Sequence, residues 1–258
     1  MIGVYRELEG SMRLAAHVLR RCWVLRLPPV AEEFLRQVWF TGASATATIV
    51  VRGALIGTLI IAYVIEVLNA DASLAVKMLL WVVLREIGPL IAAVLVIQRS
   101  GTAVATELAL MKISGEVASL RHMRIDPLDY LVVPRVTGIA LANMALTVYV
   151  QFIAVGGGMV LSALVIDASL AELAGNFFLL ASPLDLAYSI AKSLLFGAAI
   201  GVIACYYGIN PPGASINAVP KAAISAVTQA TLAVMLLNIV FAYLVYGSAL
   251  FGLFTAGP

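Results

Sequence analysis

The stretch VTGIALANMALTVYVQFIAVGGGMVLSALVI, residues 136–166, contains no charged side chain. It is longer than the roughly 20 apolar residues that an α-helix needs to cross the hydrocarbon core of a bilayer. Of all 258 residues, 62% are hydrophobic and 12% are charged, whereas a soluble domain carries about 25% charged residues. Such a chain cannot cover itself with a surface that suits water. The sequence therefore predicts an all-α integral membrane protein rather than a water-soluble one.

Five stretches are apolar enough to span the bilayer. They cover residues 46–68, 77–111, 136–166, 186–208 and 222–254. The second stretch contains the dipeptide Gly88-Pro89. A proline disfavours the α conformation of the residue before it, so a kink or break is expected there. We assign residues 46–258 to a transmembrane domain and residues 1–45 to a separate amino-terminal segment.

The amino-terminal segment is amphipathic. Between Ser11 and Arg26, helical spacing places Trp23 and other apolar side chains on one face and basic side chains on the other. A second short amphipathic piece follows Pro28-Pro29. Basic residues opposite Trp and Leu suit a helix that lies in the headgroup layer. We expect interfacial helices here, and packing against other protein is the alternative.

Lysine and arginine in the short loops predict the orientation. Basic residues concentrate before the first span and between the second and third spans, whereas the next loop contains Asp167, Glu172 and Asp185. A cytoplasmic amino terminus followed by five crossings satisfies all three loops.

Several classes of function find no support in the residues. The net charge of +2 does not favour a nucleic-acid surface. The two cysteines have no CxxC spacing and both histidines lie among arginines, so neither a metal site nor a disulfide framework is expected. The chain contains neither GxxxxGK followed by Ser or Thr nor GxSxG, and no catalytic residue is expected.

The loop Lys112–Arg135 is predicted to contain a short cytoplasmic helix over residues 113–124. Ser114 is expected to cap this helix, and Glu116 suits the positive end of the helix dipole. Asp126-Pro127 is expected to stop it. A helix between two spans can transmit force if a partner docks on it, and a solvated connector is the alternative.

The second span begins with Lys77 and contains four further charged residues: Arg85, Glu86, Arg99 and Glu107. A charge near the bilayer centre costs about 2.5–3.5 kcal/mol on insertion scales, so such residues pair or line a wet cavity. Adjacent helical residues point about 100° apart, so Arg85 and Glu86 are not expected to neutralise each other. Arg99 and Glu107 lie on nearly one face but about 12 Å apart. We interpret them as structural charges with other partners.

Three motifs carry a family resemblance: Arg85-Glu86-Ile87-Gly88-Pro89-Leu90, the run from Arg99 to Met111, and the run from Asp126 to Arg135. In this order they resemble the MlaE/YrbE family of ABC-transporter permeases. The likeness covers most of residues 46–247. The chain departs from the family pattern at several positions. Arg124 stands where a glycine is usual, and Asn238 stands where many members carry aspartate.

The resemblance implies a homodimeric permease in the bacterial inner membrane. It would move phospholipid or a related lipid between that membrane and a periplasmic MCE-domain lipid-binding protein. A separate cytoplasmic ATPase would bind the ATP, so this chain is expected to be a transport subunit rather than an enzyme and to need no cofactor of its own. In some members a small STAS-domain protein binds that ATPase.

The candidate site residues are assigned with this resemblance in view. The short helix would contact the ATPase through Glu116, Leu120, Arg121 and Met123. Arg85 and Glu86 would lie at the mouth of a lipid cavity at the dimer interface, with Arg85 meeting the phosphate. An interfacial anchor or a structural ion pair is the alternative role for these two. Ile61 and Ile65 of the first span are candidates for lining an acyl chain, although aliphatic residues in a span usually face lipid or core.

An ion-coupled secondary transporter of a hydrophobic substrate is the alternative function, with Glu86 as its titratable candidate. Such transporters often contain inverted repeats with two equivalent broken helices. Among the predicted spans only the second contains a Gly-Pro break. A membrane enzyme and a structural scaffold are further alternatives, and co-purification with an ATPase would distinguish the permease from all three.

Overall fold

The computed structural model describes residues 2–42, 80–165 and 182–255, together with the single positions 51, 55, 59 and 175. Within these ranges all regular structure is helical, which confirms the predicted all-α class. Apart from those single positions, the first predicted span at residues 46–68 lies outside the described residues. The candidate acyl-chain residues Ile61 and Ile65 lie there too.

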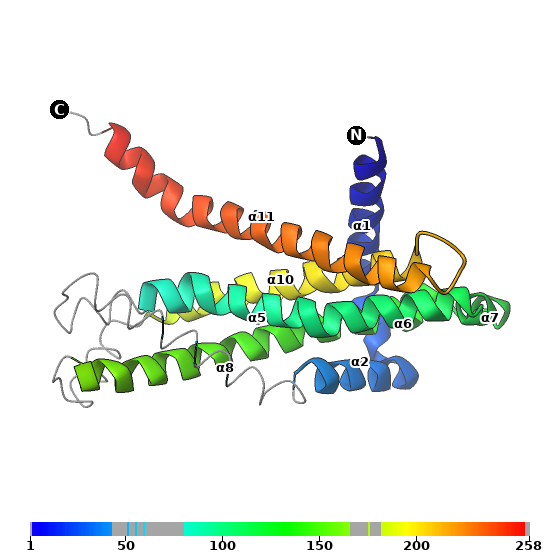
Figure 1. Ribbon diagram of the computed structural model, residues 1–258, viewed down its shortest axis with the longest axis horizontal. Helices are drawn as coiled ribbons and strands as arrows, with labels where there is room; N and C mark the ends of the chain where they lie inside the picture. Colours follow the sequence, from blue (N-terminus) through cyan, green and yellow to red (C-terminus); the bar gives the residue numbers. More distant parts are fainter. Residues whose placement is uncertain are drawn as a thin grey trace.

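The helical elements follow one another along the chain and are named as in Figure 1. They are α1 (Ile2–Arg21), η1 (Cys22–Arg26), α2 (Pro28–Thr41), η3 (Leu80–Ile87), α5 (Gly88–Val96), η4 (Ile97–Gly101), α6 (Thr102–Ile113), α7 (Glu116–His122), η5 (Leu128–Val132), α8 (Val133–Val165), α10 (Pro183–Ile209) and α11 (Ala218–Thr255). η1 is a 3₁₀-helix, and η3, η4 and η5 are π-helical segments.

Within the described residues, four helical stretches are long and apolar enough to cross a membrane. They are Val83–Ile113, Leu128–Gly157, Pro183–Ile209 and Ala218–Val245. These stretches overlap the second to fifth predicted spans. The run from η3 to α6 lies along α8 and α10 in one elongated bundle, and α11 crosses this bundle obliquely (Figure 1). The count of five spans and the side of the amino terminus stay predictions.

Small residues bring the backbones of α8 and α10 close together. A Cβ atom at Gly197 would lie 2.7 Å from the Cα of Ala140, and one at Gly201 would lie 2.8 Å from the Cα of Val136. Lipid tails are as apolar as the side chains, so membrane helices associate through close packing of this kind. Phe196 is fully buried beside this contact and belongs to the main hydrophobic core.

The second span does not end at Gly88-Pro89. η3 keeps the wider π-helical geometry up to Ile87, and α5 begins at Gly88. Pro89 has no N–H, but in the first turn of α5 that donor is not required for the new helix. The expected break is therefore absorbed as a change from π- to α-helical bonding inside one continuous stretch, Val83–Ile113.

The two amphipathic pieces of the amino-terminal segment lie differently. α1 stands across the long axis of the bundle, as a helix in the plane of a membrane would, whereas α2 lies along α8 (Figure 1). α1 exposes Met12 and Leu19, and α2 buries Val30 and Gln37. One face of α2 is thus packed on other protein, whereas Leu35 and Trp39 on α2 are exposed, and a place at the membrane surface stays a prediction for both helices.

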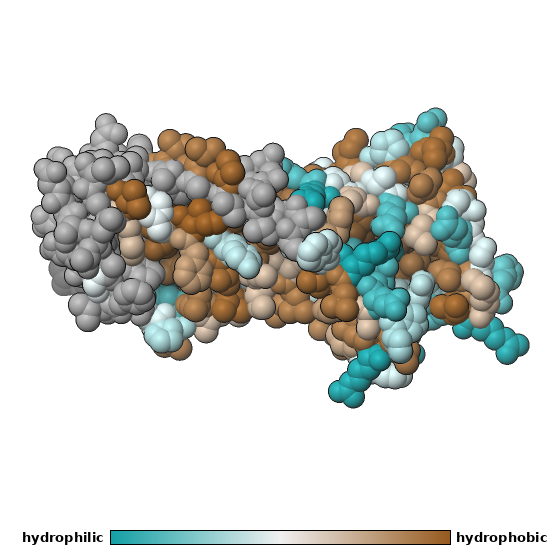
Figure 2. Space-filling model, turned by 90° about the horizontal axis from the view of Figure 1, so that it is seen from below, coloured by the Kyte–Doolittle hydropathy of each residue, from teal (hydrophilic) through white to brown (hydrophobic). Residues whose placement is uncertain are grey.

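Among the residues that the structure describes, polar side chains are concentrated toward the end that carries α1. Figure 2 shows hydrophilic residues gathered at the end that carries α1, α2 and α7, with mainly apolar residues along the middle of the bundle. This distribution suits a bundle whose middle lies in hydrocarbon and whose end with α1 and α7 lies at a membrane surface.

The turn before α7 differs from the prediction that Ser114 caps this helix. Gly115 occupies the cap position with φ of 83°, and no side chain makes a capping hydrogen bond. The Ser114 hydroxyl instead donates to Glu116 Oε1 at 2.9 Å. The tight turn from α6 into α7 requires a left-handed residue, and glycine adopts that conformation without steric cost.

The end of α7 also differs from the prediction, because the helix stops before Asp126-Pro127. The Ile125 amide donates to the Leu120 carbonyl and the Arg124 amide donates to the Arg121 carbonyl, each at 3.0 Å. This pair of bonds is the Schellman pattern, which requires a left-handed residue just after the helix. Arg124 takes that conformation, with φ of 60°.

Replacing Arg124 by glycine is therefore expected to stabilise the protein by about 1 kcal/mol. A left-handed residue with a Cβ costs about 1–2 kcal/mol, and glycine removes this strain at a smaller cost in chain entropy. Thermal unfolding of the purified protein in detergent measures the change. Arg121→Gly puts the same substitution inside α7 and should lower Tm. A Tm for Arg124→Gly at or below that of the wild type contradicts the prediction.

Candidate functional site

Polar side chains from three elements meet inside the apolar bundle. They are Arg85 and Glu86 of η3, Gln151 of α8, and Asp185, Ser189 and Lys192 of α10. We call this group the intramembrane polar cluster. It joins segments that are far apart in the sequence through two ion pairs and one amide side chain.

The first ion pair joins Arg85 to Asp185. Arg85 Nε donates to Asp185 Oδ1 at 2.7 Å, and Arg85 Nη2 contacts the same oxygen. The side chains are 22% and 11% exposed, respectively. Asp185 lies in the first turn of α10, where the positive end of the helix dipole also stabilises a carboxylate. The Asp185 carboxylate is thus stabilised both by the Arg85 guanidinium and by the amino terminus of α10.

The second ion pair joins Lys192 to Glu86, with 2.7 Å between Nζ and Oε2, and the Lys192 side chain is 0% exposed. The same ammonium donates to the Arg85 carbonyl at 3.2 Å. It also lies 5.7 Å and 5.9 Å from the ring centres of Tyr188 and Phe196, within cation–π range. A buried ammonium is tolerated when it is paired and hydrogen-bonded, and Lys192 is both.

The cluster supplies hydrogen-bond donors to the irregular backbone of η3. Pro89 has no N–H to offer the carbonyl four residues earlier, that of Arg85, and Lys192 donates there instead. Gln151 Nε2 donates to the neighbouring Leu84 carbonyl at 2.8 Å. Inside a bilayer each freed backbone group needs an internal partner. The proline in the span and the buried polar side chains therefore depend on each other.

The cluster contains two cations and two carboxylates, so its formal charges cancel. Within the described part of the chain, Glu86 Oε1 and Gln151 Oε1 are buried without a hydrogen-bond partner. An anionic ligand would have to take Arg85 or Lys192 away from its carboxylate, because both cations are already paired. This arrangement suits reversible binding of a phosphate better than a permanent anion site.

Sequence reasoning selected Arg85 and Glu86 but did not assign their partners, Asp185 and Lys192. A usable signal existed, because Lys192 is a charged residue inside the fourth predicted span and each charge in an apolar span needs a partner. Which charges pair depends on how η3 and α10 pack, and a single sequence does not give that packing.

The other two predicted structural charges do not pair with each other. Arg99 Cζ lies 5.4 Å from the centre of the Phe40 ring. Glu107 accepts a hydrogen bond from Arg135 Nη2 at 2.8 Å, and Arg36 Nη2 lies 3.7 Å from the same carboxylate. Glu107 thus joins α6 to both α8 and α2. Arg135 is almost completely buried, and sequence analysis counted it only as a loop charge.

α7 projects from the same end of the bundle as α1 (Figure 1). Glu116 and Arg121 are exposed, and Met123, just beyond the helix, is 62% exposed. Leu120 is half-buried and packs against the hydrophobic core, next to the buried Val117. Of the four residues predicted to contact an ATPase, three face outward and Leu120 faces partly inward.

A second polar group fixes α1 to the bundle. His17 Nε2 lies 2.8 Å from Asp129 Oδ1, and Arg21 Nη1 lies 3.7 Å from Asp129 Oδ2. Possible metal-ligand atoms of His17, Asp126 and Asp129 lie within 4.8 Å of one another, a grouping that sequence analysis did not foresee because the residues are far apart in the chain. Arg21 already places a cation beside Asp129, so these contacts suit an ion-pair anchor for α1.

Lys192→Met is expected to destabilise the protein by about 1.5–3 kcal/mol, because Glu86, whose side chain is 25% exposed, loses its ion pair and the Arg85 carbonyl loses its donor. The double variant Lys192→Met/Glu86→Gln removes both charges and should recover most of that loss. Lys221→Met changes an exposed lysine of α11 and should stay within about 0.5 kcal/mol of the wild type. Denaturant unfolding in detergent measures all three. If Lys192→Met were as stable as Lys221→Met, the ion pair between Lys192 and Glu86 would not support the fold.

Paired charges inside a bundle of membrane-length helices define a class of protein. Charges within such spans typically mark the pathway of a substrate or an ion, so the fold and the polar cluster define a helical membrane transport protein. The family model described as Permease MlaE matches residues 34–244. The chain therefore belongs to the MlaE permease family.

Individual relatives agree with this family. A probable ABC transporter permease protein of Rickettsia conorii is 27% identical over 218 residues, which cover 83% of each chain. A probable ABC transporter permease protein of Synechocystis is 32% identical over 167 residues, 63% of this chain and 61% of the relative. The chloroplastic protein TRIGALACTOSYLDIACYLGLYCEROL 1 of Arabidopsis thaliana is 31% identical over 156 residues, 60% of this chain and 44% of the relative. As an ABC transporter permease, the chain works with an ATPase partner.

Proposed function

We propose that this chain is the permease subunit of an ABC transporter for phospholipid or a related lipid. Two copies would assemble in the bacterial inner membrane and exchange lipid with a periplasmic MCE-domain protein. The intramembrane polar cluster carries the proposal, because it places a partly exposed Arg85–Asp185 ion pair beside the buried Lys192 inside an otherwise apolar bundle. A lipid needs both properties, an apolar path for its chains and a cation for its phosphate.

The two cations of the cluster take different roles in this proposal. Arg85 is partly exposed and Lys192 is not, so Arg85 is the cation that a phosphate can reach. When Arg85 turns to the phosphate, Asp185 keeps the favourable field of the α10 amino terminus. Lys192 remains with Glu86 and the Arg85 carbonyl, which preserves the backbone of η3.

The proposed orientation places α1 and α7 on the cytoplasmic side, since both lie at the same end of the bundle (Figure 1). The ATPase would dock on the outward face of α7, around Met123. A short turn at Gly115 connects α7 to α6. A push on α7 would therefore pass into the continuous stretch Val83–Ile113, whose far end carries Arg85 and Glu86.

The double variant Arg85→Ala/Asp185→Ala tests the contact with the headgroup. It removes an ion pair without leaving an unpaired charge, so it should be more stable than the single variant Arg85→Ala, while lipid transport should be lost. The measurement is ATP-dependent transfer of a fluorescent phospholipid from proteoliposomes that contain the permease and its ATPase to a lipid-binding acceptor protein. Glu9→Ala/Arg13→Ala removes an exposed pair of α1 and should transport normally.

If the folded Arg85→Ala/Asp185→Ala variant transported lipid at the wild-type rate, the pair would have only a structural role and Arg85 would not bind the phosphate. Transport driven by a proton gradient without nucleotide would contradict the ABC mechanism and favour the ion-coupled alternative.

Met123→Asp is expected to uncouple ATP hydrolysis from transport, because it places a charge in the proposed apolar contact with the ATPase. The exposure of Met123 means that folding should be unaffected. Met123→Leu conserves the apolar volume and serves as the matched control. ATPase activity and lipid transfer are measured on the same proteoliposomes. If ATP hydrolysis and lipid transfer stayed coupled in Met123→Asp, Met123 would not be part of the docking surface.

A further inference from the structure

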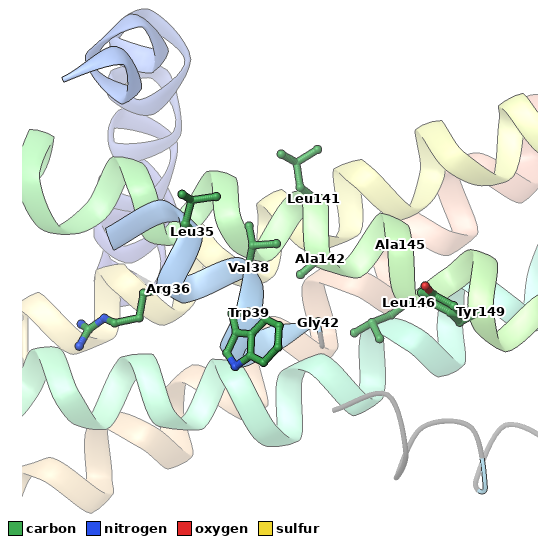
Figure 3. Close-up of a pocket in the computed structure, with 10 residues that line it drawn as sticks. All are labelled: Leu35, Arg36, Val38, Trp39, Gly42, Leu141, Ala142, Ala145, Leu146 and Tyr149. Atoms are coloured by element: carbon green, nitrogen blue, oxygen red, sulfur yellow. The ribbon is translucent and has the colours of Figure 1, made fainter. Parts of the chain in front are cut away.

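A groove lies between α2 and α8 on the outer face of the bundle, separate from the intramembrane polar cluster. Its volume is about 640 Å³, inside the range of about 300–1,000 Å³ that is typical of ligand sites. Trp39 of α2, Gly42 just after that helix, and Ala142, Ala145 and Tyr149 of α8 form much of its wall (Figure 3). The groove is thus an apolar hollow on the outer face of the described bundle.

Small residues create this hollow. α2 and α8 are in tight contact at Gly138, where a Cβ atom would lie 2.9 Å from the Cβ of Gln37. Farther along α8, a Cβ atom on Gly42 would still lie 3.8 Å from the Cβ of Ala142. Ala145 is exposed and has too short a side chain to fill the space beside it. The two helices therefore pack most tightly near Gly138 and leave the groove open farther along α8.

The groove has one charged end. Arg36 lines the end nearer α1, and its guanidinium points away from Trp39 toward that end (Figure 3). The Arg36 side chain is 66% exposed. Its contacts with Glu33 and Glu107 are made through Nη2, so Nε–H and Nη1–H can donate to a further anion. The hydrogen bond with Glu33 also raises the pKa of Arg36.

The direction of the groove matches that of a lipid in one leaflet. Between Leu141 and Tyr149 it follows α8 for about 12 Å, and α8 runs along the long axis of the bundle (Figure 1). An acyl chain in the groove would lie along the membrane normal, with its anionic head at Arg36. A lipid of the opposite leaflet would have its head group at the end of the groove that is farther from Arg36.

We propose that this groove binds one acyl chain of a glycerophospholipid from the leaflet on the side of α1, with Arg36 holding the phosphate. In the proposed function this leaflet is the cytoplasmic one, and the inference rests on the proposed function for that identification. The site is separate from the polar cluster. From Arg135, which contacts Glu33 as Arg36 does, to Gln151 of the cluster, α8 rises by about 24 Å. The two proposed phosphate partners, Arg36 and Arg85, thus belong to separate sites along the bundle.

A phospholipid with a photoreactive acyl chain tests the groove in purified permease in nanodiscs, without ATP. Irradiation should label peptides that contain residues 35–42 and 141–149. Ala145→Trp fills the groove and should lower this labelling about tenfold, the effect of a modest loss in binding free energy. Ala191→Trp places the same side chain at an exposed position of α10 and should leave the labelling unchanged.

The phosphate contact has its own test. Arg36→Gln should lower the labelling about tenfold, because one charge-assisted hydrogen bond is lost, and Arg36→Lys should lower it less. Diacylglycerol with the same photoreactive chain lacks the phosphate and should label the wild type weakly. Equal labelling by diacylglycerol, unchanged labelling of Ala145→Trp, or cross-linking of the groove to a second copy of this chain in place of lipid would overturn the proposal. The assay needs neither ATPase nor transport, so its failure is distinct from failure of the proposed function.

Discussion

The ammonium of Lys192 lies in the protein interior, away from water, and this one buried charge constrains much of the structure. An unpaired ammonium would lose several kcal/mol on leaving water, so Glu86 and the Arg85 carbonyl must lie within its reach. These contacts hold η3 against α10, and Gln151 adds α8 to the same group. The π-helical backbone before Pro89 is tolerated because the side chains of this cluster provide the donors that its carbonyls need.

The same constraint shapes the transport proposal. Because the cluster is neutral, a phosphate binds by competing with Asp185 for Arg85 rather than by filling an empty positive site. One continuous helical stretch connects this exchange to the other end of the molecule, where Glu107 contacts Arg135 and α7 follows. The π-helical segment η4 lies between the two ends, and such segments frequently occur at functional sites. Force on α7 would thus reach both the polar cluster and the groove beside α2.

Features that depend on local composition could be predicted from the sequence. Long, mainly apolar runs predicted four of the membrane-length helices, and the motifs around Arg85 and Arg135 indicated the family, which the comparison confirms. Features that depend on tertiary packing or on backbone conformation could not. The amphipathic pattern of α2 suits a membrane surface and a protein surface equally well. The predicted ends of α7 were wrong. Left-handed residues, Gly115 before the helix and Arg124 after it, determine where α7 begins and ends, in place of the expected Ser114 cap and Asp126-Pro127 stop. The homodimer and the residues of the first span stay predictions.

A density map of the permease–ATPase complex in lipid nanodiscs is the most direct test of the account. The account predicts phospholipid density in the bundle with its phosphate within hydrogen-bond distance of Arg85, the Arg85–Asp185 contact opened, and Lys192 still bound to Glu86. It also predicts the ATPase seated on α7. A map with lipid in the transport path but away from Arg85, and with the Arg85–Asp185 contact intact, would contradict it.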